Sequence, residues 1–325
     1  MRIVITGGAG FLGTRLARAI LQRGTLTDAR GRTRPIAELV LVDIAGTSGI
    51  DDARVKMLTG DLADPALIEH AITPKTDSVF HLAAVVSGQA EADFDIGVRV
   101  NLDATRALLE RCRHCSEPPK LVFTSSLAVF GGPLPDPVPD TAALMPQSSY
   151  GTQKAMGELL VYDMTRRGFI DGRSLRLPTV TVRPGKPNKA ASSFASGIIR
   201  EPLAGHEAVV PVKPETRMWV ISPDAVIANL ITGHEAPAER FTYTRSVNVP
   251  GITVSMREML DALRAVAGDA VADRVRWQFD PVVDRIVSSW PAAFDTRFGV
   301  SLGMVADRDV RDIVRAYRDE FHPAA

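Results

Sequence analysis

Tyr150 and Lys154 lie four residues apart at the start of a predicted helix, in the segment Tyr-Gly-Thr-Gln-Lys. Side chains at positions i and i+4 share one helical face, so the phenol and the ammonium group point the same way. A nearby positive charge favours the phenolate and lowers a tyrosine pKa from about 10 toward neutral pH. Tyr150 is therefore a candidate general base for a substrate hydroxyl group. The spacing alone is weakly specific, because both residue types are common on helices.

A pair of serines strengthens this interpretation. Ser125 and Ser126 lie upstream of Tyr150, at the end of a strand predicted over Leu121–Ser125. Ligand sites in open parallel sheets form at the C-terminal ends of the strands. A serine in that place can hydrogen-bond the same substrate hydroxyl as Tyr150.

Three glycines indicate a dinucleotide site. Gly7, Gly10 and Gly13 connect a buried strand predicted over Arg2–Thr6 to a helix predicted over Phe11–Arg23. The first glycine permits a tight turn, the second lets the backbone approach a pyrophosphate, and the third lets the helix pack closely on the strand. The helix N-terminus then faces the anion. A merely structural turn is the alternative, and the strand–turn–helix context argues against it.

Asp43 ends the next long strand, predicted over Glu38–Asp43. A carboxylate there accepts hydrogen bonds from the adenosine ribose hydroxyls and repels a 2′-phosphate, which favours NAD over NADP. It lies 30 residues after Gly13 because of a polar insertion at Thr25–Pro35. A solvated aspartate at a strand end is the alternative interpretation. With NAD bound, the positive nicotinamide ring would join Lys154 in favouring a phenolate.

Strands alternate with helices over the first 182 residues, which predicts βαβ units and a parallel sheet covered on both faces. Besides the segments above, we expect strands at Val55–Leu58, Ser78–Ala84, Lys120–Ser125 and Ser174–Val182, and helices at Pro65–Ile72, Glu91–His114 and Ser149–Arg167. The fold class is therefore α/β: a Rossmann-type doubly wound parallel sheet over residues 1–182. Residues 183–325 form a smaller mixed α/β lobe for substrate, from which some segments can cross back to the sheet.

The composition excludes several function classes. Lys plus Arg is 38 and Asp plus Glu is 38, so a broad cationic field for nucleic acid or an anionic membrane is not expected. There is no apolar segment of about 20 residues and no signal peptide, so we expect a cytoplasmic protein. Cys112 and Cys115 form an isolated CxxC at a helix end, which we interpret as structural, with no metal site.

The chain resembles the extended short-chain dehydrogenase/reductase family, which includes nucleotide-sugar epimerases. The motifs are TGGAGFLG at Thr6–Gly13, Asp61-Leu62, HLAA at His81–Ala84, SSLAVFG at Ser125–Gly131, the Tyr150/Lys154 pair and Arg183-Pro184-Gly185. They occur in the family's order and spacing over the first lobe. One departure is Phe130, where the family usually has tyrosine, and another is the Thr25–Pro35 insertion, which makes Asp43 the least secure match.

The resemblance implies a catalytic set of Ser126, Tyr150 and Lys154. It implies that Asp61 and Leu62 lie along the adenine and that Lys154 also holds the nicotinamide ribose. The full set of implied NAD contacts is Gly7, Gly10, Phe11, Leu12, Gly13, Asp43, Asp61, Leu62, Leu82, Ala83, Asn101, Ser125, Tyr150, Lys154, Pro178 and Val180. For Asn101, an ordinary helical role is nearly as well supported.

The substrate is less constrained. The family's dehydratases carry an Asp-Glu pair where this chain has Leu127-Ala128, so dehydration is disfavoured. Cations at Arg183, Lys186, Lys189 and Arg217, beside Ser192 and Ser193, suit a small hydroxylated anion, and they also suit a nucleotide diphosphate. The segment from Arg176 through Gly205 resembles the family members that oxidise D-erythronate at C2. That resemblance implies that Ser87, Ser126, Arg183 and Arg217 hold a sugar acid.

The leading hypothesis is thus an NAD-dependent sugar-acid dehydrogenase. The nearest alternative is a nucleotide-sugar epimerase with tightly bound NAD, and a third is a redox-sensing binding protein without catalysis. Such non-catalytic proteins typically lack an intact Ser/Tyr/Lys set, which this chain has. The helices expected at Glu91–His114 and Ser149–Arg167 match those that pair across a two-fold axis in the family, so we expect a homodimer.

Overall fold

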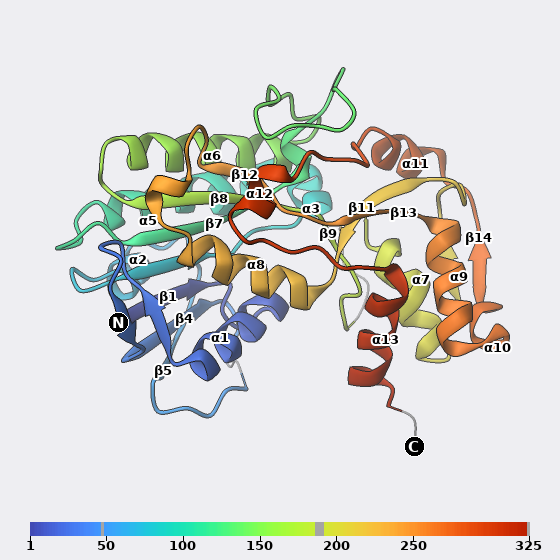
Figure 1. The fold of residues 1–325 in the computed structure, drawn as a ribbon, viewed down its shortest axis with the longest axis horizontal. Coiled ribbons are helices and arrows are strands. Elements are labelled where there is room, and N and C mark those ends of the chain that lie inside the picture. The colour runs from blue at the N-terminus through green and yellow to red at the C-terminus, as the bar shows by residue number, and fades with distance from the viewer. Residues whose placement is uncertain (47–48, 186–191, 324–325) are drawn as a thin grey trace.

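A seven-stranded parallel sheet forms the centre of the computed structural model, which describes residues 1–46, 49–185 and 192–323 (Figure 1). The strand order is β12-β8-β7-β6-β1-β4-β5, and every neighbouring pair is parallel. The strands are β1 (Arg2–Thr6), β4 (Glu38–Asp43), β5 (Val55–Thr59), β6 (Ser78–His81), β7 (Lys120–Ser126), β8 (Asp171–Leu177) and β12 (Ser246–Asn248). The chain moves outward from β1 in both directions, as in a doubly wound sheet, so the expected fold class is confirmed.

Alternating strand residues bury opposite faces of the sheet. Ile3 and Ile5 of β1 belong to one core with Leu16 and Leu230, whereas Val4 belongs to a second core on the other face. The first face is covered by α1 (Phe11–Arg23) and α8 (Pro223–Glu235). The second is covered by α2 (Pro65–Ala71), α5 (Ala104–Cys112) and α6 (Ser149–Arg166). Because both faces are buried, the strands consist of nearly continuous apolar residues.

The second lobe has a core of its own. Its strands are β9 (Thr179–Val180), β11 (Arg217–Ile221) and β13 (Ile252–Ser255) in one sheet and β10 (Ala208–Val210) and β14 (Val275–Trp277) in another. Its helices are α7 (Phe194–Leu203), α9 (Met256–Ala267), α10 (Asp269–Ala272), α11 (Pro281–Ser288) and α13 (Val310–Phe321). Later segments also return to the first lobe, where β12 is the edge strand, α12 (Arg297–Ser301) contacts it, and α8 contacts β7 and β8. We keep residue 182 as a proposed boundary, with these three elements assigned to the first lobe.

Two expected elements differ in the structure. The strand expected over Ser174–Val182 is divided between β8 and β9, which lie in different sheets, and Pro178 between them has no N–H to donate. The long helix expected over Glu91–His114 is also divided. Its pieces are α3 (Ser87–Ala92), α4 (Phe94–Gly97), a π-helical segment η1 (Val98–Asp103) and α5. Asp93 causes the first break, because its extended backbone ends α3 and its carboxylate caps α4 by accepting from the Ile96 N–H.

The insertion after Gly24 is a β-hairpin of β2 (Thr25–Thr27) and β3 (Thr33–Pro35). Asp28 closes its turn by accepting from the N–H groups of Arg30 and Arg32, each at 3.0 Å. The amino group of Met1 donates to the Pro35 carbonyl, which places the hairpin at the start of β1. The glycine turn follows the end of β1, so the insertion lies at the opposite end of the sheet from the predicted cofactor site.

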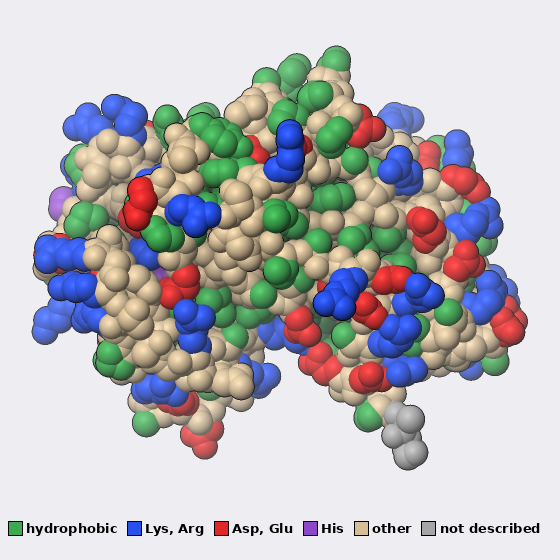
Figure 2. All heavy atoms as spheres, viewed as in Figure 1, with side chains coloured by type: hydrophobic (Ala, Val, Ile, Leu, Met, Phe, Trp, Pro, Cys, Tyr) green, Lys and Arg blue, Asp and Glu red, His purple; other side chains and the backbone are tan. Residues whose placement is uncertain are grey.

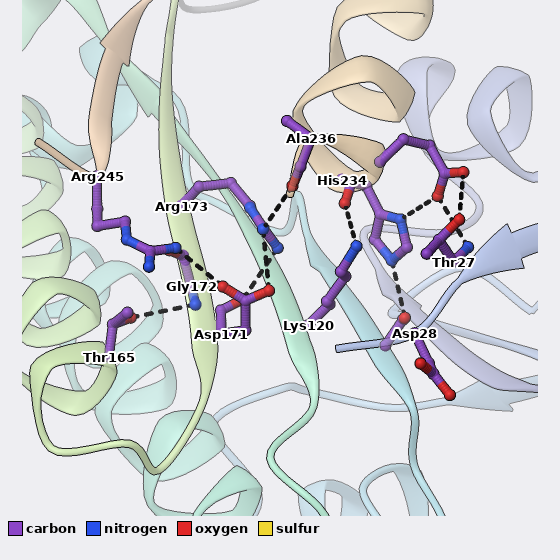
Figure 3. A network of polar contacts seen from close by, with 12 residues as sticks. Thr27, Asp28, Lys120, Thr165, Asp171, Gly172, Arg173, His234, Ala236 and Arg245 are labelled. Carbon is purple, nitrogen blue, oxygen red and sulfur yellow. Dashed lines mark hydrogen bonds and ion pairs between the residues drawn. The ribbon is translucent and has the colours of Figure 1, made fainter. Parts of the chain in front are cut away.

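A buried polar network fixes this hairpin to the sheet (Figure 3). Glu235, at the end of α8, accepts from the Thr27 N–H and from its hydroxyl, both at 3.0 Å. His234 is fully buried and contacts Glu235 through Nδ1 and the Ser78 hydroxyl through Nε2. Lys120, at the start of β7, donates to the His234 carbonyl at 2.9 Å. The network therefore joins α8, the hairpin and the starts of two strands.

Charges on the surface are of both signs. On the face shown in Figure 2, acidic and basic side chains are interspersed over the second lobe. Among the described residues, no helix has the length and apolar character that crossing a bilayer requires.

Burial of His234 makes the stability of the fold depend on pH. Burial, aided by the charges of Lys120 and Arg173, lowers its pKa to about 4 although Glu235 opposes the shift. Between pH 6.5 and 4 the unfolded chain binds a proton there that the folded chain does not, so the unfolding free energy falls as the pH falls. The slope per histidine is at most about 1.4 kcal/mol per pH unit. Urea unfolding over this range should show a shallower slope for His234→Gln.

His81 also makes the unfolding free energy fall with falling pH, because burial lowers its pKa to about 3. It is present in both wild type and His234→Gln, so both proteins keep this part of the slope. The exposed residue His70 provides the control, since His70→Gln changes the same residue type outside the buried network. Equal slopes for wild type and His234→Gln would contradict this account.

Candidate active site

The predicted catalytic side chains Ser126, Tyr150 and Lys154 line one cavity of about 270 Å³. Ser126 is the last residue of β7 and Tyr150 lies in the first turn of α6, with the Ser126 hydroxyl close enough to the phenol to affect its pKa. Lys154 follows one turn later, with Nζ 5.7 Å from the centre of the Tyr150 ring. The structure thus brings these three residues together at the C-terminal end of β7, where ligand sites of parallel sheets form.

The start of α6 lies directly against the 3-10 turn η2 (Leu127–Val129) that follows Ser126. A Cβ atom at Gly151 would be 2.1 Å from the carbonyl oxygen of Ala128, so only glycine fits there. Ser148 caps α6, its Oγ accepting from the Gly151 N–H at 3.1 Å. These contacts fix the position of Tyr150 relative to Ser126.

Lys154 is buried and held by the backbone of β7. Its Nζ donates to the Thr124 carbonyl at 2.8 Å and lies 4.7 Å from the centre of the Phe123 ring. Burial lowers the pKa of this ammonium group to about 7, and the negative charge of Glu158 opposes the shift. The charge on Lys154 is therefore sensitive to its surroundings near neutral pH.

Tyr150 differs from the expectation in one respect. Burial raises its pKa, against the opposing effects of the nearby Ser126 hydroxyl and the positive charge of Arg183. The lowered pKa expected next to Lys154 is therefore not a property of the protein alone. That expectation included the positive nicotinamide ring, whose charge would add to that of Arg183 when NAD is bound.

The glycine turn has the shape that a pyrophosphate requires. Gly7 has φ +69°, and a Cβ at Gly13 would lie 2.0 Å from the Gly7 carbonyl oxygen, so helix and strand meet without room for a side chain. Gly10 precedes α1 and no side chain caps that helix N-terminus, which leaves its N–H groups for an anion. Phe11 and Leu12 form its first turn, and Leu12 also lines the catalytic cavity.

Asp43 lies against this turn. Its Oδ2 accepts from the Ala9 N–H at 3.0 Å and its Oδ1 from the Ala45 N–H at 3.1 Å. The carboxylate is thus beside the glycine turn in spite of the hairpin insertion, as ribose recognition requires. The end of β1, the N-terminus of α1 and the Asp43 carboxylate together fit a dinucleotide.

The other predicted NAD contacts occupy several environments. Leu82, Ser125, Pro178 and Val180 line the same cavity as the catalytic residues. Ala83 follows β6 and donates its N–H to the Thr6 hydroxyl, and Leu62 is buried. Asp61 is ion-paired with Arg99 at 2.5 Å. Asn101 does not line the cavity, because its amide binds both backbone groups of Val85 and the Gln153 side chain, which secures the loop after β6 to α6.

The predicted substrate residues enter the cavity from both lobes. Ser87 and Arg183 line it, as do Ser192 and Arg217, with Trp219 and Trp290 nearby. The backbone of Arg183 is held by Ser196 and Arg200, and its side chain is close enough to Tyr150 for their charges to interact. Arg217 is exposed at the start of β11. Lys186 and Lys189 lie outside the described residues.

Comparison with known proteins identifies the family. Residues 3–242 match the model of the "NAD dependent epimerase/dehydratase family". The chain belongs to this family. It is 57% identical to a D-erythronate dehydrogenase of Cupriavidus necator over 320 residues and 43% identical to one of Haemophilus influenzae over 318 residues, each covering 98% of both chains. The expected NAD-dependent oxidoreductase class and the expected cofactor are thereby confirmed.

A solved structure extends the likeness to three dimensions. The structure described as the nucleoside-diphosphate-sugar epimerase from Agrobacterium tumefaciens has a TM-score of 0.90 and 40% identity, covering 99% of this chain and 94% of that one. The epimerase/dehydratase fold is therefore shared along nearly the full chain, including the second lobe.

The structure of the present protein also shows site residues that the sequence analysis missed. Glu158 and Arg176 form a buried ion pair next to Lys154, and Trp219 and Trp290 form part of the cavity wall. Glu158 could have been found, because it follows Tyr150 and Lys154 at the same four-residue spacing on α6. No sequence signal marks Trp290, which lies in an irregular segment after α11.

Cys112 and Cys115 have the surroundings of structural residues. Both are free, Cys112 is fully buried, and the Cys115 thiol donates to the Thr73 carbonyl at 3.4 Å. Burial raises the pKa of Cys115 to about 11 and that of Cys112 well above its usual range, so both thiols stay protonated. Protonated thiols are poor nucleophiles and poor metal ligands.

Proposed function

We propose that this protein oxidises the C2 hydroxyl of a small sugar acid, D-erythronate, to 2-oxo-tetronate with NAD as the acceptor. The observation that carries the proposal is the position of Arg183, which lines the same cavity as Tyr150 and whose positive charge opposes the rise in the Tyr150 pKa. An arginine can bind a carboxylate through two hydrogen bonds. In a 2-hydroxy acid the hydroxyl is on the carbon next to the carboxylate. A carboxylate on Arg183 would therefore present that hydroxyl to Tyr150 and Ser126.

In this mechanism Tyr150 removes the hydroxyl proton while the hydrogen on C2 leaves as a hydride, so the alcohol carbon becomes a ketone. A bound NAD would supply the hydride acceptor for this oxidation. Ser126 orients the hydroxyl and stabilises the developing alkoxide. Lys154 supplies a positive charge one helical turn from Tyr150 and would hold the nicotinamide ribose. Ser87 and Arg217 would help to bind the acid.

The names of the full-length relatives support this choice of substrate. The two relatives named above are D-erythronate dehydrogenases, and their alignments cover 98% of this chain. The epimerase alternative is favoured by the description of the Agrobacterium tumefaciens structure. The two functions share the Ser/Tyr/Lys chemistry and differ in whether NADH is released.

NADH formation distinguishes them. Purified protein with NAD and a panel of four- to six-carbon aldonates should produce NADH with D-erythronate and little with its stereoisomers. Tyr150→Phe should lower the rate about 100- to 10,000-fold, because a general base is lost, while NAD binding measured by calorimetry is retained. Interconversion of a nucleotide sugar without net NADH would instead establish the epimerase. If the protein catalyses neither reaction, the non-catalytic alternative is left.

Arg183→Met tests the assignment of the carboxylate. Loss of charge-assisted hydrogen bonds should lower kcat/KM for D-erythronate about 10- to 100-fold through KM and, because the Arg183 charge also favours the Tyr150 phenolate, through kcat, with NAD affinity unchanged. Arg257→Gln is the control, because Arg257 forms an exposed ion pair with Glu215 and does not line the cavity. Equal losses in the two variants would contradict a specific role for Arg183.

We also propose that the protein is a homodimer. Met156, Leu159 and Tyr162 repeat at three-residue spacing on α6 and are exposed, and Phe94 of α4 is exposed as well. A second copy placing its own α6 against this apolar face would bury all of them. Sedimentation velocity should give a mass of twice that of the chain. The Leu159→Glu variant should instead give the mass of a single chain. A cytoplasmic location remains a prediction from the sequence.

A further inference from the structure

One face of α6 contacts three successive residues at the end of β7. Tyr150 lies beside Ser126, with both lining the catalytic cavity, and Lys154 Nζ donates to the Thr124 carbonyl. Glu158, one turn further along, accepts from the Ser125 hydroxyl at 2.5 Å. The i, i+4, i+8 series of the helix is thus connected residue by residue to the strand that carries the catalytic serine.

Glu158 is held in turn by Arg176 of β8. Arg176 Nε donates to both carboxylate oxygens, at 2.9 and 3.1 Å, and Nη2 donates to Oε2 at 2.7 Å. Both side chains are almost inaccessible, with 4% of Arg176 and 2% of Glu158 exposed. With Ser125 included, each oxygen of the carboxylate has two donors, so its position and orientation are determined.

Arg176 is itself fixed by other elements. Its Nη1 donates to the Asp140 carbonyl at 2.8 Å and to Asn248 Oδ1 at 3.3 Å, and its guanidinium lies 4.7 Å from the centre of the Phe130 ring. The pair thereby connects α6 and β8 to the loop after Phe130 and to the edge strand β12.

A buried ion pair of this kind contributes little net stability, because desolvation of two charges offsets their attraction. Its position beside the catalytic residues indicates a different purpose. We propose that Glu158 is a positioning residue for the reaction: clamped by Arg176, its carboxylate fixes the Ser125 hydroxyl and places a negative charge one helical turn from Lys154. For catalysis this rests on the proposed dehydrogenase function; the effect on Lys154 does not.

The surroundings of Lys154 support the assignment. From α6 it faces Tyr150 and Glu158, from β7 the Thr124 carbonyl and the Phe123 ring, and from β6 the buried His81. His81, whose pKa is about 3, is neutral at physiological pH. Burial lowers the pKa of Lys154, and Glu158 supplies the negative charge that opposes this shift. Removing that charge should release the proton of Lys154 at a lower pH.

The test uses two variants. Glu158→Gln keeps the shape and removes the charge, but it leaves Arg176 buried and unpaired, which can unfold the protein. Glu158→Gln combined with Arg176→Met removes both charges and carries the test if the single variant is unfolded. The matched control is Asp171→Asn combined with Arg173→Met, which removes a buried ion pair at the other end of the sheet.

The first readout needs neither substrate nor cofactor. In protein with ¹³C-labelled lysine, the NMR titration midpoint of Lys154, assigned with Lys154→Met, should fall by about one pH unit or more in the Glu158 variants. The control should leave it unchanged. An unchanged midpoint in a folded Glu158 variant would overturn the proposal, whatever substrate the enzyme uses.

The second readout is the pH profile of NADH formation from D-erythronate. The alkaline limb of kcat should move toward lower pH by the same amount, which at pH values above it is about a tenfold loss of rate per unit. A folded variant with wild-type kcat and an unmoved limb would show that the pair is only structural. If wild type produces no NADH, the proposed function fails, and the Lys154 titration still decides the role of Glu158.

Discussion

The close contact between Gly151 and the carbonyl oxygen of Ala128 determines the arrangement of the whole site. Because no Cβ fits between them, the first turn of α6 lies on the turn that follows β7. Everything that α6 carries is then placed relative to the strand end: the phenol beside Ser126 and the ammonium on the Thr124 carbonyl. The glycine turn imposes a similar closeness at Gly13, where helix and strand meet at the other half of the site. Two close backbone contacts, at Gly151 and at Gly13, thus fix the catalytic residues and the predicted cofactor site relative to the central sheet.

Much of the fold follows from patterns that are local in sequence. β1, β4, β6 and β7 are short apolar runs, and α1 has apolar residues at helical spacing before Gly24, so their types and order are predictable. The division of Glu91–His114 into four pieces is not, because the apolar spacing continues through Asp93 while the backbone turns there. The second lobe is harder still. Its strands of two to five residues are too short for a period to be recognised, and its sheets pair segments that are distant in the chain.

The site divides in the same way. Gly13, Tyr150 and Lys154 are recognisable because turn geometry and helical spacing restrict which residues can be there. Glu158 and Arg176 were missed because charged residues are ordinarily read as exposed, and nothing nearby in sequence shows that they face each other across α6 and β8. The direction of the Tyr150 pKa shift also depends on burial, which only the packed structure reveals.

The return of β12 to the central sheet affects how the protein can be made and divided. Residues 246–248 form the last strand beside β8, and α8 covers Leu175 and the buried Arg173 before that strand is reached. During synthesis the Rossmann sheet therefore remains open at one edge until about three quarters of the chain has left the ribosome. A fragment ending at residue 182 would keep the nucleotide-binding turn but expose one sheet edge and one apolar face. The two lobes are thus distinct regions of the structure, but the first lobe cannot complete its sheet without β12 from the second half of the chain.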